Sequence, residues 1–344
     1  MIPPITNTHP ALRRCWLPLA RASELGEQPA RFMLLDQPLV AFRSPADGQV
    51  RVYPDRCPHR GAPLSIGCAE GGGIRCAYHG WRFGPDGRCD EIPALGPNPS
   101  GIPPKAHLTP VAGTAERYGM VFVALDEPLP GVGLPEVPEA DNPRFAMGEL
   151  PILSARASVG LLADNFLDTA HFPFVHAATF GASEEREVGR FEVTREPGEL
   201  AFTATYQHQF ANREDPAVAR GERPLLQTRR LTYRLVAPFH LTLRIEFLEA
   251  GGTNTIGFFL QPETAEACRI MSAIWRDDLD GDAERLREAV EFEVKVVEED
   301  LRVQEAYHRL ELPLDPTAEV HTRADRTTIE LRRVLSDLVA ASSK

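Results

Sequence analysis

Four residues in the first quarter of the chain restrict which metal centre its first part can bind. Cys57-Pro-His59 is followed, after sixteen residues, by Cys76-Ala-Tyr-His79. Each segment offers one thiolate and one imidazole, a spacing unlike the paired cysteines and paired histidines of most zinc modules. Two such loops can hold a [2Fe–2S] cluster, with the cysteines on one iron and the histidines on the other. The pattern therefore predicts a [2Fe–2S] site, and a structural zinc site is the alternative.

The residues around this pattern support a cluster held by loops. Arg60-Gly61-Ala62-Pro63 and Gly80-Trp81 favour tight turns in which backbone N–H groups approach sulfur. The remaining cysteines have no partner pattern and are predicted to be small buried side chains: Cys15, Cys68, Cys89 and Cys268.

The organisation of the chain predicts two domains, residues 1–145 and 146–344, which suits a length of 344 residues. Short apolar runs cut by turns predict an all-β first domain with strands over 32–35, 39–42, 50–53 and 120–125. Its end is a proline-rich linker. Longer alternating runs then predict an antiparallel sheet with strands over 190–195, 201–210, 227–236, 239–248, 257–260 and 270–275.

The last third of the chain predicts one long helix behind that sheet. Apolar residues recur there at intervals of three and four, namely Leu286, Val290, Val294, Val297 and Leu301. The fold class is therefore α+β, an all-β domain followed by an antiparallel sheet with a long C-terminal helix.

A second group of metal-ligand residues opens the second domain. The segment Asn165-Phe-Leu-Asp168-Thr-Ala-His171-Phe-Pro-Phe-Val-His176 places two histidines five residues apart. Pro173 predicts that a helix ends near His171 and that His176 lies in the turn beyond it. Two imidazoles and one carboxylate form the facial triad of non-haem Fe(II) oxygenases. For the carboxylate, the late helix offers Asp300, with Glu299 as its nearest rival.

These motifs resemble the Rieske non-haem iron oxygenases, in particular the single-subunit class that includes vanillate demethylase, dicamba monooxygenase and phthalate dioxygenase. The resemblance implies a Rieske [2Fe–2S] domain and a helix-grip catalytic domain. It implies cluster ligation by Cys57, His59, Cys76 and His79, and iron ligation by His171, His176 and Asp300. It also implies a head-to-tail homotrimer in which Asp168 joins His79 of one subunit to His171 of its neighbour. Asn165 is expected near the iron without ligating it.

The expected function is that of a terminal oxygenase. A ferredoxin or flavin reductase would supply electrons from NAD(P)H, because no nucleotide-binding fingerprint is evident in this chain. With O₂, the enzyme would hydroxylate or oxidatively demethylate an aromatic or otherwise apolar organic substrate whose identity the sequence does not specify. Phe166, Phe247 and Phe258 are candidate pocket residues. The alternatives are ring cis-dihydroxylation and, in another class, an electron carrier fused to a non-catalytic ligand-binding domain.

Composition bears on the partners and on the compartment. The formal net charge of −12 argues against nucleic acid and permits a basic redox partner. The start of the chain lacks the basic and apolar regions of a signal peptide, and no apolar run is long enough for a membrane span. A cytoplasmic protein is therefore expected.

Overall fold

The computed structural model describes residues 3–96, 101–182, 186–195, 197–213 and 215–343. They form two compact units, one of Leu12–Pro128 and one of Leu129–Lys344 together with Met1–Ala11. The division thus comes before the proline-rich stretch, whereas the boundary predicted from sequence follows it. Glu139, inside this stretch, accepts a 3.1 Å bond from Arg244 of the large sheet, which ties the stretch to the second unit.

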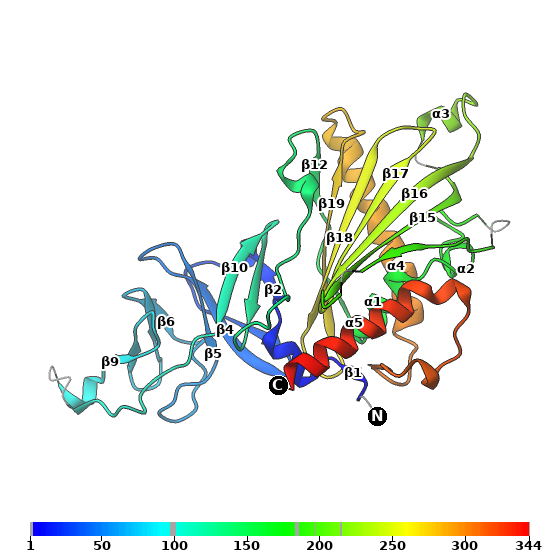
Figure 1. The fold of residues 1–344 in the computed structure, drawn as a ribbon. Coiled ribbons are helices and arrows are strands. Elements are labelled where there is room, and N and C mark those ends of the chain that lie inside the picture. The colour runs from blue at the N-terminus through cyan, green and yellow to red at the C-terminus, as the bar shows by residue number, and fades with distance from the viewer. Residues whose placement is uncertain (1–2, 97–100, 183–185, 196, 214, 344) are drawn as a thin grey trace. The chain divides into compact units, whose positions relative to one another are not determined.

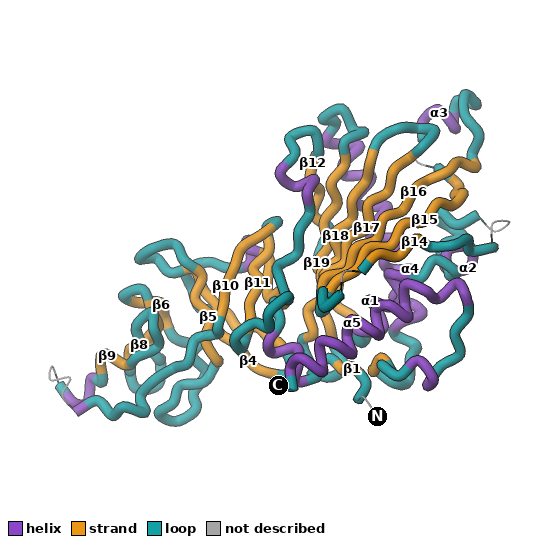
Figure 2. The backbone as a smooth tube through the Cα atoms, viewed as in Figure 1, coloured by secondary structure: helices purple, strands orange, loops and turns teal. Residues whose placement is uncertain are grey.

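The first unit consists of small antiparallel sheets joined by long loops (Figure 2). One sheet contains β3 (Ala30–Leu34), β4 (Gln37–Arg43) and β5 (Val50–Pro54). Another contains β10 (Gly113–Arg117), β11 (Met120–Ala124) and β2 (Leu17–Arg21). The third contains β6 (Cys68–Glu70), β7 (Gly73–Arg75), β8 (Arg82–Phe83) and β9 (Cys89–Glu91). Strands predicted over 32–35, 39–42, 50–53 and 120–125 are therefore confirmed.

The second unit is built on a sheet of eight strands (Figure 1). Its order is β12 (Ala146–Glu149), β19 (Cys268–Arg276), β18 (Thr253–Pro262), β17 (His240–Phe247), β16 (Leu226–Val236), β15 (Ala201–Ala211) and β14 (Glu192–Thr194). The eighth strand, β13 (Leu153–Ala155), also pairs with β19. All of these pairings are antiparallel, as predicted from the alternating runs. A separate two-stranded ladder joins β1 (Ile5–Thr6) to β20 (Glu311–Leu312).

The predicted late helix is α4 (Ala283–Gln304). It begins at Asp282, whose carboxylate accepts hydrogen bonds from the backbone N–H groups of Glu284 and Arg285. It packs closely on β12, where a Cβ added to Gly148 would lie 2.7 Å from Val290. The other helices of the second unit are α1 (Val159–Leu167), α2 (Phe172–Val175), α3 (Pro216–Ala219) and α5 (Arg326–Ser342).

The prediction of a single late helix was wrong, because α5 follows α4. Its buried face includes Leu331, Leu335 and Leu338, and it packs against α1. The buried Arg332 guanidinium pairs with Asp164 of α1 and with Glu319, each at 2.6 Å. A buried arginine in an otherwise apolar stripe weakens the helical periodicity, and its carboxylate partners are remote in sequence.

We predict that Arg332→Met destabilises the protein by roughly 3 kcal/mol, because breaking a buried ion pair leaves an uncompensated charge. Burial raises the pKa of Asp164 even with Arg332 beside it, which shows how poorly this site hydrates a lone carboxylate. Chemical denaturation of both proteins measures the difference in unfolding free energy. The matched control is Arg333→Met, since Arg333 is 62% exposed and leaves only a partly hydrated partner, Glu330, which also pairs with Arg195. Equal losses in the two variants would contradict the prediction.

Candidate cluster and iron sites

The two cysteine–histidine segments fold into loops with the same backbone hydrogen bonds. In each loop the cysteine N–H donates to the carbonyl five residues later, at 2.8 Å for Cys57 and 2.9 Å for Cys76. Each cysteine carbonyl accepts the N–H of the glycine four residues later, Gly61 or Gly80. These glycines have φ of 74° and 73°, a region that disfavours residues with a Cβ. The repeated geometry explains why glycine occurs at the same spacing in both motifs.

In the two loops, the candidate cysteine ligands are buried and the candidate histidine ligands are more exposed. Cys57 and Cys76 are each 2% exposed and belong to the core of this unit. His59 is half-buried and His79 is exposed, with their ring centroids 4.5 Å apart. The His59 ring also stacks on Trp81 at 4.4 Å. The sulfur atoms therefore lie on the core side of the site and the imidazoles on its outer side.

The chemistry of these side chains fits a bound cluster. Burial raises the pKa of Cys57 to about 11, so a ligand that binds its thiolate must displace a proton. Burial, followed by the charges of His79 and Arg60, lowers the pKa of His59 and favours the neutral imidazole that coordinates metals. Nδ1 of His59 is also buried and has no hydrogen-bond partner among the described residues. A buried ring nitrogen without a partner suits a metal ligand.

In the second unit, a one-turn helix lies between the two candidate iron-ligand histidines. His171 immediately precedes α2 and His176 immediately follows it, with Pro173 in the first turn. The helix before them, α1, ends at Leu167, so the prediction that it extends to near His171 was wrong. Asp168 adopts an extended conformation and lies outside the helix. Its carboxylate accepts a hydrogen bond from the backbone N–H of Ala170 at 2.9 Å, which stabilises the turn after α1.

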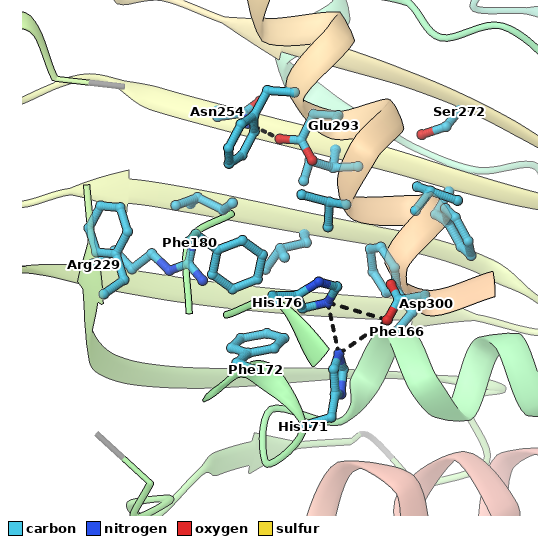
Figure 3. A pocket seen from close by; sticks show the side chains of 18 of the residues that line it. Phe166, His171, Phe172, His176, Phe180, Arg229, Asn254, Ser272, Glu293 and Asp300 are labelled. Atoms are coloured by element: carbon cyan, nitrogen blue, oxygen red, sulfur yellow. Dashed lines mark hydrogen bonds and ion pairs between the residues drawn. The ribbon is translucent and has the colours of Figure 1, made fainter. Parts of the chain in front are cut away.

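The structure brings Asp300 of α4 to these histidines (Figure 3). The Nε2 atoms of His171 and His176 are 3.1 Å apart. Oδ1 of Asp300 lies 3.4 Å from the first nitrogen and 3.3 Å from the second. Ligand atoms about 2.1 Å from one metal ion lie roughly 3.0 to 3.4 Å apart for angles between right and tetrahedral. Oδ1 of Asp300 is also buried without a hydrogen-bond partner in the described chain. These three side chains fit a metal ion.

Carboxylates hold the outer nitrogens of both histidines. Nδ1 of His171 lies 3.1 Å from Asp168, and Nδ1 of His176 lies 2.8 Å from Glu299. Glu299 also accepts the hydroxyl hydrogen of Thr179 at 2.8 Å. A carboxylate at Nδ1 favours the proton there and leaves Nε2 with its lone pair facing the other candidate ligands. Sequence reasoning treated Glu299 only as a rival of Asp300, whereas the structure gives the two acids different contacts.

Neighbouring groups in the site shift the pKa values of His176 and Asp168 against the effect of burial. Burial lowers the pKa of His176, but Asp300 and Glu299 together outweigh it, so the net shift is upward. Burial raises the pKa of Asp168, but its bond to His171 and the backbone N–H groups around it outweigh burial and lower that pKa. Asp168 therefore remains charged beside the His171 imidazole.

Asn165 does not reach the three candidate ligands through a hydrogen bond that the structure records. Its Oδ1 accepts a 3.1 Å bond from Nε2 of Gln304, at the end of α4. Asn165 nevertheless lines the same pocket as His171 and Asp300. That Asn165 lies near an iron without ligating it stays a prediction.

The three side chains open into a mostly apolar pocket of about 880 Å³, its opening to solvent included. Figure 3 shows it between the sheet and α4. All three aromatic residues proposed from sequence line it, namely Phe166, Phe247 and Phe258. Aliphatic side chains complete its walls, including Leu243, Ile245, Ile256, Val296 and Val297. Pockets of this kind bind small organic molecules through apolar contact and a few polar groups.

One wall of the pocket contains a buried cation that the sequence did not predict. Arg229 is 5% exposed, and its guanidinium lies 4.4 Å from the ring centroid of Phe180 and 4.7 Å from that of Phe210. Its Nε donates to Nε2 of His208 at 2.8 Å. Burial, then the charge of Arg229, lowers the pKa of His208 to about 2, so this histidine stays a neutral acceptor.

The cysteines outside the cluster loops differ in exposure. Cys15, Cys89 and Cys268 are buried as expected, whereas Cys68 is exposed. Cys68 begins β6, the edge strand of its small sheet, which leaves its side chain accessible. Among the described residues, no helix has the length and apolarity needed to cross a bilayer.

Comparisons with known proteins match both parts of the chain to families. Residues 15–110 match the Rieske [2Fe-2S] domain, and residues 155–341 match the vanillate O-demethylase oxygenase C-terminal domain. Methylxanthine N3-demethylase NdmB of Pseudomonas putida is 28% identical over 345 residues, 96% of this chain and 90% of that protein. The 3-chlorobenzoate-3,4-dioxygenase oxygenase subunit of Comamonas testosteroni is 34% identical over 178 residues, which cover 50% of this chain and only 40% of that protein.

A solved structure extends the likeness to the whole fold. NdmA of Pseudomonas putida CBB5 with caffeine is 25% identical, with a TM-score of 0.79 over 95% of this chain and 91% of that one. The C-terminal match alone spans more than half of this chain. The Rieske [2Fe-2S] domain and the oxygenase domain together imply a [2Fe–2S] cluster and a non-haem iron that acts with O₂. The chain therefore belongs to the Rieske oxygenases whose catalytic domain is that of vanillate O-demethylase oxygenase, as its motifs predicted.

Proposed function

We propose that this terminal oxygenase hydroxylates or oxidatively demethylates a small, largely apolar and aromatic substrate. Its mononuclear Fe(II) would be held by His171, His176 and Asp300. The observation that carries the proposal is that these three side chains converge at one end of an apolar pocket. When bound, the iron supplies O₂ activation and the cluster supplies electrons.

The residues of the chain would position the substrate and exclude water. Aliphatic and aromatic walls favour an apolar ring in the pocket, and they remove water that would compete for reactive groups. Asp168 and Glu299 fix the orientation of the two imidazoles from outside. Hydroxylation of a methyl group consumes O₂, two electrons and two protons; one oxygen atom enters the C–H bond and the other leaves as water. Where the methyl group was bound to oxygen or nitrogen, the hydroxymethyl product then loses formaldehyde and leaves an O–H or N–H group.

Electrons would come from a separate NAD(P)H-dependent reductase, directly or through a ferredoxin, to a cluster held by Cys57, His59, Cys76 and His79. In a head-to-tail homotrimer, Asp168 would connect this cluster to the iron of a neighbouring copy. Two features support that role. His79 is exposed, so another copy can reach it, and the Asp168 side chain is 26% exposed while it contacts His171.

Ring cis-dihydroxylation is the second candidate reaction, because one partial relative is a 3-chlorobenzoate-3,4-dioxygenase subunit. Turnover under ¹⁸O₂ separates the reactions: a hydroxylated product gains one labelled atom, a demethylated product gains none because the label leaves with formaldehyde, and a cis-diol gains two. An electron carrier fused to a non-catalytic ligand-binding domain would leave the convergence of His171, His176 and Asp300 without a role. Metal analysis that found no iron beyond the cluster would favour it.

We predict that His171→Ala abolishes oxygenation and removes the mononuclear iron, because two remaining ligands bind iron weakly. The cluster spectrum should be unchanged, since its candidate ligands belong to the other unit. Iron analysis, electron paramagnetic resonance and product detection with an added reductase test this together. The control is His308→Ala, an exposed histidine beyond α4. Retained oxygenation in His171→Ala would refute the assigned iron site.

We predict that Asp168→Asn keeps both metal centres but slows product formation about 10- to 100-fold, the usual cost of losing a partner of a ligating histidine. Reduction of the cluster by the reductase should proceed normally, whereas its reoxidation in the presence of substrate and O₂ should slow. Stopped-flow absorbance follows both steps. Asp337→Asn, on the surface of α5, serves as the control. A normal reoxidation rate in Asp168→Asn would exclude the connecting role.

We predict that Gly80→Ala lowers the content of iron and acid-labile sulfide. Its φ of 73° strains any residue with a Cβ by about 1 kcal/mol, and the new Cβ would lie 3.0 Å from Pro93. The control is Gly48→Ala, which has a similar φ of 72° but no atom within 4 Å of the added Cβ.

A purified wild-type protein with zinc in place of iron and sulfide would contradict the whole assignment of this site.

A further inference from the structure

Two buried polar residues face the pocket away from the candidate iron ligands. Glu293 lies seven residues before Asp300 on α4, which is about two helical turns, or roughly 10 Å along the axis. Asn254 lies opposite on β18, where Ile256 and Phe258 line the same pocket at alternate positions. Glu293 is 8% exposed and Asn254 is 2% exposed. Figure 3 shows this pair at some distance from the histidines.

The hydrogen bond between them fixes the orientation of the amide. Nδ2 of Asn254 donates to Oε1 of Glu293 at 2.9 Å. In this bond the carboxylate oxygen accepts, so the NH₂ group of Asn254 faces Glu293. The amide oxygen must then point elsewhere. Oδ1 of Asn254 is buried and has no hydrogen-bond partner within the described parts of the chain. A buried acceptor without a partner is costly, which points to a donor supplied from outside the protein.

Other polar groups around the pocket already have partners in the protein. Arg229 donates to His208 and stacks on aromatic rings. Arg213 donates to the carbonyl of Thr179. Ser272 donates to the carbonyl of Gly257 at 2.7 Å.

The Tyr233 hydroxyl is a second buried group without a partner among the described residues. Because a hydroxyl can donate or accept, it does not discriminate between ligands. The amide oxygen of Asn254 accepts only, and it therefore selects for a donor.

We propose that the Asn254–Glu293 pair selects substrates that carry an N–H group, as in an amide, a lactam or an N–H heterocycle, at the end remote from the iron. The substrate N–H donates to Oδ1 of Asn254, and the negative charge of Glu293 behind the amide strengthens that acceptor. The aliphatic walls contact the ring between this end and the iron. The inference rests on the proposed function, because it concerns the substrate of the same pocket.

The test is binding to the iron-loaded protein, measured by calorimetry under anaerobic conditions. The probes are 4-methoxybenzamide, its N,N-dimethyl analogue and 4-methoxybenzoate. The primary amide should bind about tenfold more tightly than the N,N-dimethyl amide, because the latter leaves Oδ1 of Asn254 unpaired. Equal affinity of the two amides, including no detectable binding of either, would overturn the proposal. Tightest binding of the benzoate would also overturn it, and would transfer the anchoring role to Arg229.

Variants of Asn254 and Glu293 test whether these two residues cause the preference for the primary amide. Asn254→Leu combined with Glu293→Met removes both polar partners at similar volume, which avoids leaving either one unpaired. This double variant should bind the two amides equally. Glu293→Gln should retain folding but lose most of the preference, because a neutral amide no longer fixes the orientation of Asn254. Glu246→Gln is the matched control; this acid lies on β17 between Ile245 and Phe247, which face the pocket, and pairs with Arg244 instead.

This experiment separates the two proposals. Binding is measured without turnover, so a missing preference for the N–H probe leaves oxygenation, measured with a reductase, intact. Conversely, failure of His171→Ala to lose oxygenation would refute the iron site without changing the affinity ratio of the two amides. A double variant that still prefers the primary amide would refute the role of Asn254 and Glu293 alone.

Discussion

The candidate iron site depends on how α4 holds His176 from two sides. Glu299 contacts the outer nitrogen of this ring, and the next residue, Asp300, approaches its inner nitrogen. Consecutive helical residues point about 100° apart, so the ring must lie between the two directions for both acids to reach it. This constraint fixes the distance and rotation of α4 relative to the His171–His176 turn. The pocket is the space that remains between the helix and the sheet.

Buried polar side chains on α4 would be unfavourable without partners, and Glu293, Glu299 and Gln304 each bond to a distant segment. Glu293 accepts from Asn254, Glu299 contacts His176 and Thr179, and Gln304 donates to Asn165. Unpaired burial of such groups costs several kcal/mol, so the partners are as necessary to the helix as its apolar side chains. Along α4, hydrogen bonds to β18, to the segment around His176 and to α1 therefore accompany the aliphatic contacts.

Local sequence patterns predicted the cluster loops and most strands. The features that they did not predict depend on contacts between residues far apart in the sequence. The Cys57 and Cys76 loops follow from short motifs with glycine at the same offset, and the alternating runs predicted the strands of the large sheet. The contact of Glu299 with His176 joins residues 123 positions apart, and spacing within a helix contains no information about it. The early end of α1 depends on Asp168 bonding its own turn. Helix α5 was missed because its buried Arg332 interrupts the apolar stripe.

The two metal sites differ in what their assembly requires. The candidate cluster ligands lie on two short loops whose backbones are closed by their own hydrogen bonds, within a small core of their own unit. The candidate iron ligands come from the two ends of a one-turn helix and from α4, and their meeting depends on the packing of the sheet, α1 and α4. The substrate pocket shares those same elements. Residues such as Asn254 on β18 can therefore change what the pocket accepts while the candidate ligands, which stand on other elements, keep their positions.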